Sequence, residues 1–180
     1  MSNSPRRPSS TRRPGRPGRP GPPAVTAQRP GFELPLLLLA GFRVLIDDLH
    51  AELRQQGHPD LRPSHGFVLQ AIGRYGTTAA DLGRRLGVSK QAAGKTIDNL
   101  QQIGYVIRVP DTVDQRQKIV VLTDFGVDAL QRSAAIFERL RAGWADALGA
   151  DRLQALETDL ETVTGEAAFQ LDTPGWFGAG

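Results

Sequence analysis

The chain has 180 residues, with 22 Lys and Arg against 19 Asp and Glu, which gives a formal net charge of +3. This length fits one ordinary domain, with or without a tail, and a hydrophobic content of 39% is below the level of a membrane protein. Cysteine is absent, which excludes disulfides, thiolate metal sites and a catalytic thiol, and fits a cytoplasmic protein.

The charge is distributed unevenly along the chain. Residues 1–30 carry seven arginines and no acid, so the remaining 150 residues sum to −4. Within this body, residues 60–125 carry +3 and residues 126–180 carry −5. This pattern indicates a polyanionic partner that is approached from one side.

The beginning of the chain is rich in proline, glycine and arginine. Residues 1–31 hold eight of the 13 prolines and almost nothing apolar to bury, so we expect a disordered basic tail. Its Gly-Arg-Pro triplets partly resemble minor-groove-binding AT-hook segments, but the composition favours a solvated tail. The apolar run that follows is too short for an export signal or a membrane span, so we expect no membrane partner. Residues 167–180 are interpreted as a second tail.

A long helix is predicted over residues 33–57. Its first part, from Leu36 to Phe42, is apolar on nearly every side, and later apolar residues recur at helical spacing beside acidic ones. A helix end that is apolar all round requires more cover than a small domain provides. We therefore expect a partner chain here, with Gly57 ending the helix.

Three shorter helices follow. A helix over 64–75 is expected to end at Gly76. Thr78 has the position of the N-cap of a short helix, and Ser89 has that of a helix over 90–102.

The periodicity then changes. Two β-branched runs, residues 105–109 and 118–122, predict a β-hairpin. Thr123 caps a long helix that reaches about residue 148, and a last helix covers 151–166. The expected fold is mainly α-helical with a small β-hairpin: a winged helix-turn-helix.

The helix over 90–102 has two distinct faces. Ala93, Ile97 and Leu100 form its apolar face. The opposite face holds two cations, an amide and a glycine, namely Lys90, Gln91, Gly94 and Lys95. Lysine and glutamine hydrogen-bond base edges and phosphates. Close approach of the backbone to DNA would explain the glycine, and a tolerated accident of sequence explains it equally well.

Residues 76–126 resemble the winged helix-turn-helix of the MarR family. The matching features are L-x-x-x-L-G-V-S, a following helix that ends in L-x-x-x-G-hydrophobic-V, D-x-R in the wing, and L-T-x-x-G. The resemblance implies a domain over 32–166, with a DNA-binding lobe over 62–123 and dimerisation helices over 33–57 and 124–166.

The resemblance also implies which side chains meet DNA. Ser89, Lys90, Gln91, Lys95 and Thr96 would meet the major groove. Arg116 would enter the minor groove, aimed by Asp114, with Gln117 and Lys118 beside it at the far side of the loop. The chain departs from the family pattern at Gly83, Gly94 and Thr96, which affects the individual base contacts rather than the docking mode.

The predicted function is a dimeric, sequence-specific transcription regulator. It would bind double-stranded DNA at a near-palindromic operator, as a repressor released by a small aromatic or anionic effector. The resemblance places that effector between the dimer helices and the lobe, near Arg43, Ile46, His50, His65 and Leu69, although packing or solvent exposure also explains each. The alternatives are a ligand-independent DNA-binding regulator and a winged helix used for protein contacts.

Enzymatic chemistry has little support. The chain has three histidines and no Gly-rich phosphate loop, and Ser64 and His65 are adjacent, so they would not face each other on a helix. A metal site from His50, His58, Asp60 and His65 is conceivable, but loop and helix-surface histidines are more common. We therefore predict no enzyme, no metal and no cofactor.

Overall fold

A computed structural model of the chain describes residues 29–111 and 116–165. The elements follow the predicted order: α1 (Glu33–Gln55), α2 (Pro63–Ile72), α3 (Ala79–Leu86), α4 (Lys90–Gln102), β1 (Val106–Pro110), β2 (Lys118–Leu122), α5 (Asp124–Leu148) and α6 (Ala150–Thr164). The predicted fold class, mainly helical with a small β-hairpin, is confirmed. The two predicted tails lie almost entirely outside the described residues.

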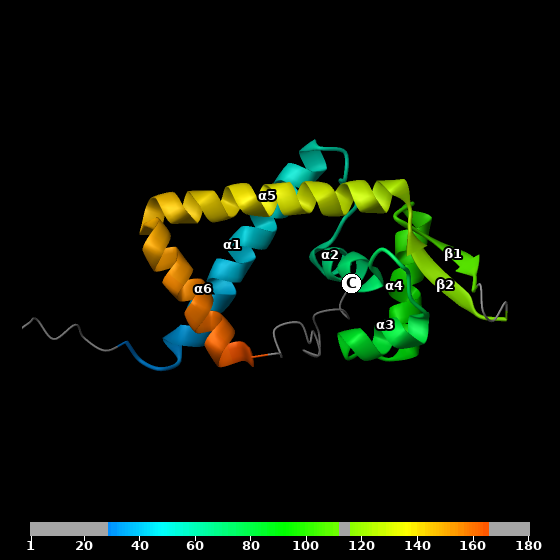
Figure 1. Ribbon diagram of the computed structural model, residues 1–180, viewed down its shortest axis with the longest axis horizontal. Helices are drawn as coiled ribbons and strands as arrows, with labels where there is room; N and C mark the ends of the chain where they lie inside the picture. The colour runs from blue at the N-terminus through cyan, green and yellow to red at the C-terminus, as the bar shows by residue number, and fades with distance from the viewer. Residues whose placement is uncertain (1–28, 112–115, 166–180) are drawn as a thin grey trace, which may run out of the picture.

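The molecule has two parts, which Figure 1 separates clearly. The helix α5 spans most of its length, α1 packs across α5, and α6 turns back from the far end of α5. We call α1, α5 and α6 the helical frame. At the other end of α5 lie α2, α3, α4 and the hairpin, which together form the winged lobe, residues 62–123.

The wing is an antiparallel pair of strands that is tied to the rest of the lobe. Its register runs from Val106 opposite Leu122 to Pro110 opposite Lys118. Thr77 forms an isolated antiparallel bridge with Val120, with backbone N–O distances of 3.0 and 2.8 Å. The base of the wing is therefore fixed to the loop before α3.

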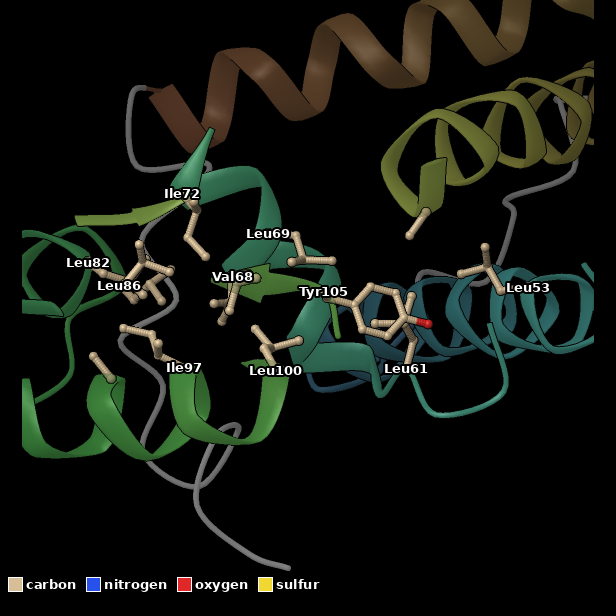
Figure 2. Packing of buried hydrophobic residues seen from close by; sticks show 14 of the residues in the cluster. Leu53, Leu61, Val68, Leu69, Ile72, Leu82, Leu86, Ile97, Leu100 and Tyr105 are labelled. Atoms are coloured by element: carbon tan, nitrogen blue, oxygen red, sulfur yellow. The ribbon is translucent and has the colours of Figure 1, made fainter. Parts of the chain in front are cut away.

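The core lies mainly in the winged lobe and at its junction with the frame. Fully buried leucine, isoleucine and valine side chains from α2, α3 and α4 pack together. Figure 2 shows this cluster, with the Tyr105 ring between the lobe's Leu100 and the junction residues Leu61 and Leu53. Aliphatic burial of this kind is the main stabilising contribution in a domain of this size.

The end of α2 differs from the prediction. The helix ends at Ile72 and not at residue 75, because Gly73 adopts a left-handed backbone with φ of +63°. Gly76, predicted to end the helix, has φ of +77° and packs under the wing. A Cβ atom at Gly76 would lie 2.6 Å from the Val120 carbonyl oxygen, so glycine is required there by close approach.

The helical frame leaves a large apolar surface uncovered. In the first half of α1, Leu34, Leu36, Leu37, Leu38 and Leu39 are between 46% and 63% exposed. In the described part of the chain, no helix combines the length and the apolar character needed to cross a membrane.

Candidate nucleic-acid interface

Two capped helices form the helix-turn-helix. The Thr78 hydroxyl accepts a hydrogen bond from the Asp81 amide at 3.1 Å, and the Ser89 hydroxyl accepts one from the Ala92 amide at 3.1 Å. Between them Gly87 has a left-handed backbone, with φ of +67°. These caps satisfy amides at the start of each helix, so the turn between α3 and α4 is set by local sequence.

The turn also explains one departure from the family pattern. A Cβ atom at Gly83 would lie 2.8 Å from the Val88 carbonyl oxygen, and the Gly83 carbonyl itself accepts a hydrogen bond from the Val88 amide at 2.9 Å. The backbone of α3 and the turn are in contact here, which leaves no room for a side chain at position 83.

The outer face of α4 presents most of the predicted DNA-contacting residues. Lys90, Gln91 and Lys95 are exposed, while the apolar face of α4 is buried in the lobe. A Cβ atom at Gly94 would meet nothing within 4 Å, so packing within the chain does not require glycine there. The Thr96 hydroxyl donates to the Ala92 carbonyl at 3.2 Å and is half-buried. Lys90, Gln91 and Lys95 therefore lie on the solvent-facing side of α4, in the half of the helix next to the turn.

The wing adds further exposed polar side chains. Arg116, Gln117 and Lys118 are exposed at the start of β2. The Asp111 amide donates to the Gln117 carbonyl at 3.0 Å, which continues the pairing of the strands toward the tip. Asp114, predicted to aim Arg116, lies outside the described residues.

A basic hollow joins the wing to the helix-turn-helix. Lys90 from α4, Arg116 and Lys118 from the wing and Arg108 from β1 line it, together with the first turn of α3. Four cations from separate parts of the sequence thus surround one concave surface, which favours a polyanion.

Arg108 was not predicted as a site residue, and its contacts explain its role. Its guanidinium donates to the Asp98 carboxylate at 2.6 Å and to the Gln101 side-chain oxygen at 2.7 Å, both on α4. The Arg108–Asp98 ion pair links the wing to α4. It also balances the negative charge of Asp98 on the helix that carries Lys95. An arginine two residues into a β-branched run gave no sequence signal for this contact.

A second concave site lies between α1, α2 and α5. It is a small hollow, with a cavity volume of about 30 Å³, that opens to solvent on one side, and its lining is mostly apolar. Among the predicted effector residues, Ile46, His50 and Leu69 line it. His65 is buried but outside the lining, and Arg43 is exposed and outside it. The structure adds aromatic rings that sequence reasoning missed, those of Phe67 and Phe137.

The two histidines near this cavity are held neutral. Burial, with the charge of Arg54 adding to it, lowers the pKa of His50 from its ordinary value, and a hydrogen bond to the backbone of Leu61 opposes the shift. Burial and the charge of Arg62 lower the pKa of His65 to about 4. His50 Nδ1 is buried and has no hydrogen-bond partner among the described residues. These histidines therefore add no positive charge to the cavity wall.

The histidines do not gather into a metal site. His58 Nδ1 lies 3.0 Å from the Tyr105 hydroxyl and Nε2 lies 2.9 Å from Asp128, so both ring nitrogens are occupied. Within residues 29–111 and 116–165, no group of three or more histidine and acidic side chains is placed to hold a metal ion.

A helix-turn-helix followed by a two-stranded wing, with long helices on either side in sequence, defines a winged-helix protein. Residues 60–117 match the sequence pattern of the MarR family, which confirms the resemblance for most of the winged lobe. No curated protein matches the chain.

Solved structures of this class share the fold at low identity. Wild-type MarR from Escherichia coli in its apo form is 24% identical, with a TM-score of 0.58, over 76% of this chain and 98% of that one. FabT from Streptococcus pneumoniae in complex with DNA is 17% identical, with a TM-score of 0.63, over 73% and 93%. The transcriptional repressor CouR, bound to a 23-mer DNA duplex, is 23% identical, with a TM-score of 0.59, over 73% and 92%. The likeness covers frame and lobe together.

Proposed function

We propose that this protein is a transcription regulator that binds double-stranded DNA through α4 and the wing. The observation that carries the proposal is that Lys90, Gln91 and Lys95 are exposed on one face of α4, while the opposite face is buried in the lobe. Beside them lies a hollow lined by Arg116 and Lys118. Lysine and glutamine on a helix suit the major groove, and an arginine on a wing suits the narrow, negative minor groove. FabT and CouR, which share the fold, have been solved with DNA.

We further propose that the regulator is a homodimer that reads a near-palindromic operator. The exposed leucines of α1 form an apolar surface on the frame, away from the proposed DNA-binding face. A second copy with the same surface would cover it in an isologous contact and place two α4 helices about one DNA turn apart. The same geometry predicts two related half-sites in the operator.

The test uses full-length protein and a duplex recovered from a random library by repeated selection. Lys95→Ala should weaken binding by about 1–3 kcal/mol if Lys95 reads a base. Arg116→Ala should weaken binding most on duplexes with A/T-rich flanks. Arg152→Ala, which removes an exposed cation from α6, is the matched control. Affinities would be measured by fluorescence anisotropy over a range of salt concentrations. If both substitutions matched the control, the proposed DNA face would be wrong.

We also propose that the regulator is a repressor, released when a small ligand fills the cavity between α1, α2 and α5. The cavity touches both frame and lobe, so a ligand that prefers one angle between them would change the spacing of the α4 helices. Of the two predicted effector classes, the apolar lining and the neutral histidines favour an uncharged aromatic compound over an anion. If the His50 ring turned so that Nδ1 reached the cavity surface, a phenol hydroxyl would donate to it.

A ligand screen separates the classes. Neutral phenols should raise the melting temperature and release the selected duplex at pH 7.5, whereas benzoates of the same size should act more weakly. His50→Leu should abolish the preference for phenols, and Arg43→Ala, on the exposed side of α1, should leave it unchanged. A broad screen in which no compound changes either DNA affinity or melting temperature would favour the ligand-independent regulator.

A further inference from the structure

A polar cluster, in which His58 and Tyr105 are buried and Asp128 is half-buried, joins three distant parts of the chain. His58 lies in the loop between α1 and α2 and is fully buried. Its Nδ1 is 3.0 Å from the hydroxyl of Tyr105, which precedes β1, and its Nε2 is 2.9 Å from Asp128 on α5. Neither the proposed DNA face nor the cavity uses these side chains, so the cluster needs its own explanation.

The partners of His58 determine the direction of each hydrogen bond. Hydrogen bonds from Arg132 and from His58 hold the pKa of Asp128 below its usual value, so the carboxylate is an acceptor. Burial raises the pKa of Tyr105 to about 12, so its hydroxyl keeps its proton. In the tautomer that carries its proton on Nε2, His58 donates to Asp128 through Nε2–H and accepts from the Tyr105 hydroxyl at Nδ1. The result is a directed chain from Tyr105 to Asp128.

Aromatic and backbone contacts pack against one side of this chain of hydrogen bonds. The Phe125 ring lies 4.5 Å from both the His58 and the Tyr105 ring, measured between centroids. A Cβ atom at Gly126 would lie 2.3 Å from the Tyr105 carbonyl oxygen, so the first turn of α5 rests directly on the chain entering the wing. The first turn of α5 is therefore one of the places where the lobe meets α5, in addition to the packing of α2 against α5.

The cluster also reaches the end of α1. Arg132 donates to Asp128 at 2.7 Å and to the Gln56 side-chain oxygen at 3.3 Å. Residues close in sequence to the cluster line the cavity. Leu53 and Leu61 lie on either side of His58 in the chain, and Ala129 follows Asp128. Whatever fills the cavity therefore adjoins the contact between lobe and frame.

Apolar side chains could fill the same space, but they would tolerate sliding. Buried hydrogen bonds are directional, and each unsatisfied group is penalised, so they select one arrangement of the parts they join. We propose that the Tyr105–His58–Asp128 cluster fixes the angle between the winged lobe and α5, with His58 as the positioning residue. The consequence of that angle for DNA binding rests on the proposed function. The proposal that the cluster fixes the angle does not rest on it.

The experiment measures the angle without DNA. Because the chain has no cysteine, Gln102→Cys on α4 and Glu138→Cys on α5 place two spin labels at exposed sites in the full-length protein. Labelled protein is diluted in excess unlabelled protein, so that pulsed dipolar spectroscopy reports the distance within one chain. We expect a single narrow distance distribution in the parent protein. Tyr105→Phe, which removes one hydroxyl, and His58→Gln should broaden that distribution or shift it.

Two controls separate positioning from stability. Tyr75→Phe makes the same change at the other tyrosine, which is 81% exposed, and should leave the distribution unchanged. Ile72→Val, in the buried core of α2, should lower the melting temperature and also leave it unchanged. If Tyr105→Phe and His58→Gln lowered the melting temperature but left the distance distribution unchanged, as expected for Ile72→Val, the cluster would only stabilise the protein and the proposal would be wrong. If the parent protein did not bind DNA, the proposed function would be wrong, but this inference would stand.

Discussion

The winged lobe and the helical frame bury their apolar residues in different ways. In the lobe, Val68, Ile97 and Leu100 have no exposed surface, and the helices cover one another. In the frame, α5 has 25 residues and buries only three, and α6 has 15 residues and buries one. The lobe thus completes its core within one chain, whereas the frame does not.

The difference shows how to read an apolar helix. In α4 the apolar residues occupy one stripe, and the lobe covers that stripe. At the start of α1 they surround the helix, and half of their surface remains open. A contiguous apolar surface of this kind is uncommon on a monomer and indicates a contact with another molecule. The following predictions test the contrast between the two parts.

The largest effect is expected from charges on the apolar surface of α1. Leu37→Glu with Leu38→Glu should give a monomer at micromolar concentration, where we expect the parent chain to be a dimer. Each buried leucine contributes about 1.5–3 kcal/mol, and an isologous interface counts each one twice. Light scattering measures the mass, and far-UV circular dichroism checks that the lobe remains folded.

The control is a similar change in the lobe. Tyr75→Glu replaces an exposed aromatic residue with an acid and should leave the mass unchanged. A parent protein that is monomeric at micromolar concentration, or a double variant that stays dimeric, would show that the surface of α1 is not the dimer contact.

A smaller effect is expected from pH at the junction of lobe and frame. The folded protein holds the pKa of His65 at about 4, while the unfolded chain keeps the ordinary value near 6.5. Below pH 6.5 the unfolded chain takes up a proton that the folded protein does not, so stability is complete above 6.5 and falls toward pH 4. The loss from this residue between pH 7 and pH 5 is about 2 kcal/mol.

Chemical denaturation at the two pH values measures this loss. His65→Gln keeps an acceptor for the Arg62 amide, which His65 Nδ1 binds at 3.2 Å, and removes the titration. The variant should therefore lose less stability than the parent between pH 7 and pH 5. Equal losses would assign the pH dependence to other groups.

Substitutions of two glycines within the lobe should have effects of opposite sign. Gly83→Ala brings a methyl group against the Val88 carbonyl and should destabilise the protein by about 1–3 kcal/mol. Gly94→Ala meets open space and should stabilise the protein by about 1 kcal/mol, since alanine favours the helix.

DNA binding gives the second measurement on this pair. If the α4 backbone approaches DNA at Gly94, the more stable Gly94→Ala variant should bind the selected duplex less tightly. Unchanged affinity would mean that glycine at position 94 serves neither packing nor recognition.

Local sequence was sufficient for the helix starts. Thr78, Ser89 and Thr123 were each predicted as N-caps, and each hydroxyl accepts a bond from the amide three residues later. Cap formation depends on neighbouring residues, so a short window of sequence contains the information. The end of α2 was predicted wrongly, because Gly73 and Gly76 both fit a helix stop and only packing against β2 distinguishes them.

Periodicity predicted which side of α4 is exposed, but not the tertiary partners. His58 follows Gly57, the predicted end of the first helix, and the local sequence does not indicate its partners. It binds Tyr105, 47 residues away, and Asp128, 70 residues away. Arg43 shares a helix with His50 but lies outside the cavity, because the lining depends on how α1 packs against α2 and α5. Contacts of this range have no signature in a local window.

The long separation between α1 and α5 has a consequence during synthesis. Glu52 on α1 pairs with Arg139 on α5, 87 residues later in the chain. At a translation rate of about 5–20 residues per second, α1 waits roughly 4–17 s on the ribosome before this part of α5 has been made. Throughout that interval the face of α1 that becomes buried, which includes Ile46, Leu49 and Leu53, is without the α5 side chains that later pack on it. The order of the elements therefore leaves newborn α1 with an uncovered apolar face until α5 has been made.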